Sequence, residues 1–92
     1  MIERRSKASI LRDILRTIEK KNGKARPTHI LYGANLSHDR LKGYLNLLAV
    51  QGFVKKEISG RETFFVITDR GREYLSGFNK MKKFFDAFGV EI

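Results

Sequence analysis

The 92-residue chain contains no cysteine, a single proline and no apolar run near the roughly 18 residues that a membrane-spanning helix needs. Without cysteine it has no disulfide, no thiolate metal site and no cysteine nucleophile. The N-terminus reads MIERRSKAS and lacks the apolar segment of a secretory signal, so we expect no export. These absences favour a cytoplasmic protein without a membrane partner.

Acidic residues are also scarce, with ten Asp and Glu against 19 Lys and Arg, which gives a net charge of +9. Such an excess indicates a polyanionic partner, most simply nucleic acid, with an acidic membrane surface as the rival. Residues 1–27 hold nine basic and three acidic residues, or +6 of the excess. Because clustered like charges repel each other, we expect this segment to face phosphate groups.

The sequence offers little for catalysis. His29 and His38 are nine residues apart, and no further histidine or cysteine completes a metal site. The serines lack the context of a nucleophile, and the isolated glycines form no phosphate-cradling loop. We therefore expect no enzyme activity, no metal, no cofactor and no small-molecule ligand.

Residues 28–53 read THILYGANLSHDRLKGYLNLLAVQGF and predict a short helix, a turn at positions 33–35 and a longer helix. Leucines at positions 36, 41, 45 and 48 follow helical spacing. Ser37 is placed to cap the longer helix, and Gly52 is placed to end it. This pattern is typical of a helix-turn-helix, whose second helix can enter the DNA major groove.

The flanking segments complete this pattern. An amphipathic helix is expected from Ser6 to Asn22-Gly23, followed by a basic link at residues 24–26 and a helix entry at Pro27. Residues 53–58 and 62–67 predict two strands joined by a tight turn at Ser59-Gly60. A hairpin directly after a helix-turn-helix is the wing of a winged helix.

A last helix is expected from Asp69, capped by Thr68 and stopped near Gly89. Its apolar residues follow a heptad spacing, which indicates a homodimer interface. The alternative is that the stripe packs on the first helix of the same chain. The candidate interface residues are Tyr74, Phe78, Met81, Phe84, Phe85 and Phe88. The predicted fold is mainly α with a small β-hairpin, divided into a winged helix-turn-helix at 1–68 and a dimerisation helix at 69–92.

Three stretches carry a resemblance to a known family: ILYGANLSHDRLKGYLNLLAVQGFV, ETFFVITDRGREYL and the aromatic last helix. Together with the first helix, they resemble the small basic archaeal DNA-binding proteins of the Sulfolobus 10a type, a winged-helix family. The resemblance implies DNA binding and dimerisation through an antiparallel coiled coil of the last helices. The last helix of this chain spans only about 20 residues, or about 30 Å, so we expect a compact aromatic contact instead.

Candidate DNA-binding residues lie on the outer face of the second helix of the motif, on the wing and near the N-terminus. They are Ser37, His38, Arg40, Lys42, Asn46, Lys55, Lys56, Arg61, Arg4, Arg5, Lys7, Lys24 and Arg26. Few of these side chains suit base reading, so the sequence predicts phosphate-driven, weakly selective binding to double-stranded DNA. An architectural, chromatin-like role in the nucleoid follows, with a sequence-specific regulator and a protein-contact module as the alternatives.

Overall fold

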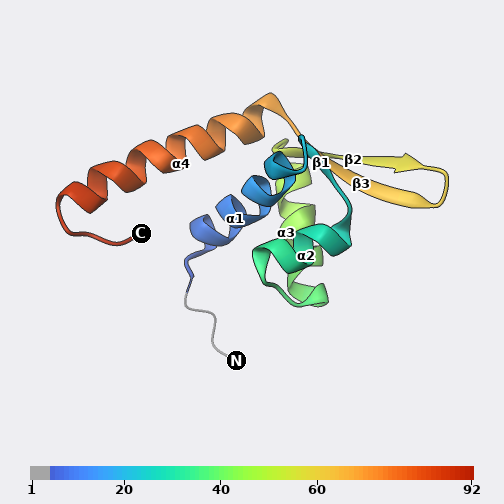
Figure 1. The fold of residues 1–92 in the computed structure, drawn as a ribbon, viewed down its shortest axis with the longest axis horizontal. Helices are drawn as coiled ribbons and strands as arrows, with labels where there is room; N and C mark the ends of the chain where they lie inside the picture. The colour runs from blue at the N-terminus through green and yellow to red at the C-terminus, as the bar shows by residue number, and fades with distance from the viewer. Residues whose placement is uncertain (1–4) are drawn as a thin grey trace.

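The structure is a computed structural model that describes residues 5–92. In this part of the chain, four helices and three short strands follow one another (Figure 1). The elements are α1 (Lys7–Lys20), β1 (Lys24–Ala25), α2 (Pro27–Ala34), α3 (His38–Val50), β2 (Val54–Ser59), β3 (Glu62–Ile67) and α4 (Asp69–Ala87). The strands form an antiparallel sheet in the order β1–β3–β2. This arrangement confirms the predicted winged helix with an additional C-terminal helix.

Side-chain caps fix the starts of three helices. The hydroxyl of Ser6 accepts a hydrogen bond from the amide of Ser9, and Ser37 and Thr68 cap α3 and α4 in the same way. Each cap satisfies an amide that the first helical turn leaves without a backbone partner. The remaining helix, α2, begins instead with Pro27 in its first turn, where a missing N–H costs nothing.

All four helices end in the same way. After each last turn, the chain adopts a positive φ (at α1 in two successive residues), and two amides bond back to helix carbonyls as in a Schellman motif. The residues in the left-handed conformation are Asn22 with Gly23, Asn35, Gly52 and Gly89. Asparagine and glycine tolerate this conformation best, which explains why the sequence predicted three of these ends correctly.

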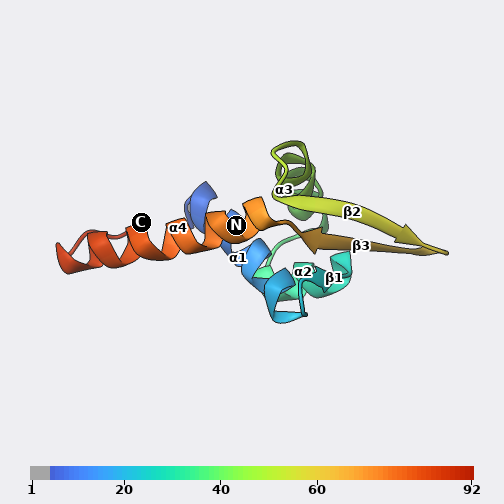
Figure 2. The same ribbon diagram turned by 90° about the horizontal axis from the view of Figure 1, so that it is seen from above.

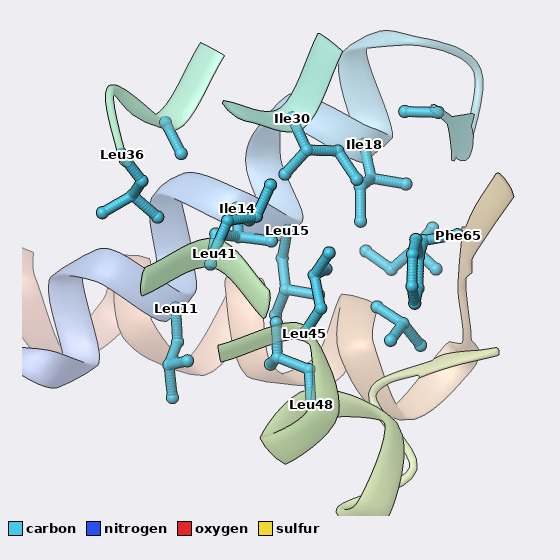
Figure 3. Close-up of a cluster of buried hydrophobic side chains, with 14 of the residues drawn as sticks. Leu11, Ile14, Leu15, Ile18, Ile30, Leu36, Leu41, Leu45, Leu48 and Phe65 are labelled. Atoms are coloured by element: carbon cyan, nitrogen blue, oxygen red, sulfur yellow. The ribbon is translucent and has the colours of Figure 1, made fainter. Parts of the chain in front are cut away.

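The hydrophobic core is built around α1. Ile10, Ile14, Leu15 and Ile18 are at most 1% exposed. Figure 3 shows side chains from α1, α2, α3 and β3 pointing toward one another, including Ile30, Leu45, Leu48 and Phe65. Burying each such side chain stabilises the fold by about 1.5–3 kcal/mol. The leucine stripe of α3 therefore faces the core, as its spacing predicted.

The sequence prediction is wrong at two places before α3. The basic link at residues 24–26 contains a strand, because Lys24 and Ala25 pair with Val66 and Phe65 of β3. The turn of the helix-turn-helix lies at residues 35–37, because α2 continues through Gly33 to Ala34. A Cβ at Gly33 would lie 2.4 Å from Thr17 of α1, so this glycine permits close helix packing and does not make a turn.

The wing is a regular hairpin. The turn predicted at Ser59-Gly60 lies one residue later, because Ser59 pairs with Glu62 and Gly60 and Arg61 form a two-residue loop, with a positive φ at Gly60. Glycine at the first position of such a loop is typical of a type II′ turn. In both views the hairpin and α4 project from opposite sides of the helical core (Figures 1 and 2). The hairpin tip thus lies far from the end of α4.

The two halves of α4 have different surroundings. Its first half packs on α1: the Tyr74 hydroxyl donates to the Ala8 carbonyl at 2.7 Å, and Phe78 is buried beneath Arg12. Its second half projects from the core and exposes Met81 and Phe84. No helix in the described residues is long and apolar enough to cross a bilayer.

Candidate nucleic-acid interface

A groove of about 1010 Å³ runs between α2, α3 and the sheet. Its floor is apolar and includes Leu41, Leu45 and Phe65. Four of the candidate DNA-binding residues line it: His38, Lys42, Asn46 and Lys56. We call this surface the α3–wing groove. It brings the outer face of the second motif helix and one face of the hairpin together, as a winged helix requires.

Capping and helical spacing aim the α3 side chains at this groove. Ser37 fixes the start of α3 because its Oγ accepts from the amide of Arg40 at 3.3 Å. With Leu41, Leu45 and Leu48 buried, the helical period turns Lys42 and Asn46 outward, where both are exposed. The orphan amides of the first turn and a lysine on the rim can hold phosphate, and an asparagine amide can pair with adenine.

The pleat of the wing separates two neighbouring candidates. Val54 is buried against the core, and successive strand residues point to opposite faces, so Lys56 lies on the core-facing side and Lys55 on the outer side. Lys56 lines the α3–wing groove, whereas Lys55 does not. Arg61 is exposed at the hairpin tip, where it can reach a groove or backbone of DNA.

The outer face of the sheet holds two further candidates in ion pairs. Lys24 Nζ lies 2.8 Å from Glu57 Oε1, and Arg26 Nη2 lies 2.7 Å from Glu62 Oε1. Both cations also stack on the ring of Phe64, at 4.5 and 5.7 Å from its centroid. These contacts fasten β1 to the hairpin, and neither residue lines the α3–wing groove.

The remaining basic candidates lie elsewhere. Arg5 Nη2 donates to the Asn35 carbonyl at 3.0 Å, so it braces the turn between α2 and α3. Arg40 is half-buried, with its Nη2 3.4 Å from the Tyr44 hydroxyl. Lys7 is exposed at the start of α1. Arg4 lies outside the described residues.

The sequence analysis missed three polar residues of the α3–wing groove: Thr28, Tyr32 and Thr63. Tyr32 is 76% exposed on α2, one turn after Thr28. Because Ile30 and Ala34 of α2 are buried, the helical period alone places Thr28 and Tyr32 on the opposite face. That argument, applied to α2 as well as α3, would have found them.

The candidate dimer residues fall into two groups. Tyr74 and Phe78 pack within the chain, with ring centroids 6.3 Å apart. Beyond them, Met81, Phe84 and Phe88 are exposed and Phe85 is half-buried. The Phe84 ring lies 5.2 Å from that of Phe88 and 5.7 Å from that of Phe85. We call these four residues the α4 aromatic patch.

Comparison with solved structures gives similar folds at low sequence identity. Sso10a-2, a DNA-binding protein from Sulfolobus solfataricus, is 24% identical with a TM-score of 0.82, over 91% of this chain and 85% of that one. F93 from STIV, a winged-helix DNA-binding protein, is 10% identical with a TM-score of 0.74, over 84% and 90%. A MarR family transcriptional regulator from Silicibacter pomeroyi is 16% identical with a TM-score of 0.72, over 86% of this chain but 54% of its own.

The likeness to Sso10a-2 confirms, at the level of the fold, the resemblance to the Sulfolobus 10a type. Comparison with curated protein sequences gives no significant match. A model of the winged helix-turn-helix family matches residues 4–85, which is most of the chain. With the motif, the wing and this match in agreement, the chain belongs to the winged helix-turn-helix family.

Proposed function

We propose that the protein binds double-stranded DNA, with α3 in the major groove and the wing alongside. Binding rests mainly on phosphate contacts and is weakly selective for sequence, which suits an architectural, chromatin-like role in the nucleoid. The observation that carries this proposal is the α3–wing groove, with Lys42 and Lys56 on its two sides. The proposed role is binding and not catalysis.

The α3–wing groove offers few groups for base reading. On α3, Asn46 and His38 can hydrogen-bond base edges, Lys42 can bond either guanine or phosphate, and Gly43 has no side chain to read with. Asp39 is acidic and suits the positive end of the α3 dipole better than a phosphate. Affinity from phosphates with little base contact yields weak discrimination between sequences.

Two of the similar structures support DNA as the ligand. Sso10a-2 and F93 are both described as DNA-binding proteins. The similarity to a MarR family transcriptional regulator favours the alternative role of a sequence-specific regulator. The two roles differ in the ratio of specific to random-duplex affinity at matched salt. We expect a ratio near one, and a ratio above about 10³ would favour the regulator.

Salt dependence tests the phosphate contribution. If a dimer neutralises about 6–10 phosphates, log affinity falls with log salt at a slope of about −5 to −9. Fluorescence anisotropy of one labelled duplex across several salt concentrations measures this slope. A flat response would contradict phosphate-driven binding.

The neighbouring lysines of the wing provide a matched pair. We expect Lys56→Gln to weaken binding and to make the salt slope shallower by about one unit for each protomer that contacts the duplex, because each phosphate contact contributes about 0.9. Lys55→Gln removes the same charge from the opposite face and should leave the slope nearly unchanged. Equal effects of the two substitutions would mean that the hairpin does not present its core-facing side to DNA.

We also propose that the α4 aromatic patch joins two copies of the chain. Heptad spacing and mutual ring contacts give α4 a continuous apolar face beyond the part that packs on α1. An exposed cluster of this kind on a small protein marks an interaction site. A second copy is the fitting occupant because it supplies an identical apolar face in a symmetric contact.

A further inference from the structure

We propose that a second groove, between α1 and α4, is a phosphate-binding surface that contacts a second segment of DNA. This inference rests on the proposed function, in which the first segment occupies the α3–wing groove. The two grooves have no lining residue in common. In Figures 1 and 2, α1 and α4 lie side by side on the far side of the core from the hairpin tip.

The first observation is where the charge lies. Residues 1–27 carry +6 of the net +9, yet Pro27 is the only one of the described residues among them that lines the α3–wing groove. The α1–α4 groove has a volume of about 420 Å³ and contains several of these charges. It is lined by Arg12, Arg16, Glu19, Lys20, Leu75 and Asn79. Of the basic residues described in this segment, Arg12, Arg16 and Lys20 thus line the α1–α4 groove, and none lines the α3–wing groove.

The second observation is how these charges are paired. Glu19, the acidic lining residue, is held by Arg72 of α4, with Arg72 Nε 2.8 Å from Glu19 Oε2. Arg12 is engaged with Asp13 and the Phe78 ring. Arg16 and Lys20 are exposed and make no ion pair or hydrogen bond within residues 5–92. Arg72 thereby neutralises the charge of Glu19, and Arg16 and Lys20 remain available to bind a ligand.

The third observation is helical spacing. Arg12, Arg16 and Lys20 lie four residues apart, so they form one row on α1 at intervals of about 6 Å. Like charges at this spacing on a helix repel one another. A phosphate backbone relieves that repulsion, and the amide of Asn79 adds a hydrogen-bond donor on the α4 side.

Leu75 is the sole large apolar lining residue, which disfavours a protein partner that needs aromatic or aliphatic anchors.

Residue-resolved NMR tests the proposal. The ¹⁵N-labelled protein is titrated with a duplex of about 12 base pairs, little longer than one helical turn. Up to one duplex per protomer, we expect amides of α3 and the wing to shift, including Lys42 and Lys56. Beyond that ratio, amides of Arg16, Lys20 and Asn79 should shift in a second phase. Counting per protomer removes the effect of dimerisation, because every protomer has one groove of each kind.

The outcomes separate the two claims. Shifts confined to α3 and the wing, even with excess duplex, would overturn the second surface and leave the proposed function standing. Absence of shifts in both regions would overturn both.

A pair of double variants sharpens the result. Arg16→Gln with Lys20→Gln should abolish the second phase, or lower its salt slope by about two, and leave the first phase unchanged. Lys80→Gln with Lys83→Gln removes two exposed charges from α4 residues that line neither groove, and should preserve both phases. Equal loss of the second phase in both variants would show general charge attraction in place of a defined surface.

Discussion

Gly43 and Gly77 both lack a side chain inside a helix, which lowers the stability of the protein. At Gly43 the same absence favours binding, because it leaves space for DNA to approach. Each lies inside a helix at an exposed position, and a Cβ at either would have no protein atom within 4 Å. Glycine in a helix interior costs about 1 kcal/mol relative to alanine. Packing therefore does not explain these two glycines, whereas close packing does explain Gly33.

We predict that Gly43→Ala and Gly77→Ala each stabilise the protein by about 1 kcal/mol, which raises Tm by about 4–8 °C. Gly43 lines the α3–wing groove, so its added methyl group should hinder close approach of DNA and lower affinity several-fold. Gly77→Ala is the matched control and should leave affinity unchanged. Thermal unfolding and anisotropy measure the two effects, and unaltered DNA affinity in Gly43→Ala would contradict the assigned contact face.

At the scale of elements, Tyr74 joins α4 to α1. Burial raises the pKa of its hydroxyl above the usual value near 10, and the charge of Arg12 partly opposes this shift. The hydroxyl donates to the Ala8 carbonyl, which requires the neutral form. Because the folded-state pKa is raised, its contribution to stability is present below about pH 10 and is lost as pH rises through that pKa.

We therefore predict that Tyr74→Phe lowers the free energy of unfolding by up to about 1 kcal/mol at neutral pH, the typical value of a hydrogen bond. The difference between wild type and variant should shrink above about pH 10. Urea unfolding of both proteins at matched pH values measures it. A difference that stays constant through this range would mean that the hydroxyl does not tie the two helices together.

The elements also show what local sequence can and cannot predict. Caps such as Ser37 and Thr68 and stops such as Gly52 act within a few residues, so the sequence alone predicted them. The strand β1 is only two residues long and exists because β3, about 40 positions later, offers it a partner. No feature of residues 24–26, which read Lys-Ala-Arg, predicts that pairing.

The same distinction applies to the candidate site. Helical period predicted that Lys42 and Asn46 face outward. The sequence analysis named both Lys55 and Lys56, although the strand period places them on opposite faces. The pairing of Lys24 with Glu57 spans 33 positions and depends on the sheet register, so the sequence could not show it. Charge density in residues 1–27 indicated a phosphate ligand but not which surface would carry the charges.

At the scale of the whole molecule, the α4 aromatic patch predicts the oligomeric state. We expect a dimer at micromolar concentration in sedimentation and expect Phe84→Gln with Phe88→Gln to give a folded monomer, because both rings are exposed in the single chain. Val50→Gln is the control: Val50 is 75% exposed on α3 and its loss should preserve the dimer. A wild-type monomer at this concentration would contradict the proposed interface.

The opposed directions of the wing and α4 have a consequence for spacing. If two copies associate through the α4 aromatic patch and each binds a duplex, the length of α4 sets the distance between the two duplexes. One heptad inserted after Phe78 would move the partner outward by about 10 Å without touching either core. The length of one solvent-facing helix would then set the packing density of neighbouring duplexes, independently of the affinity of each protomer for DNA.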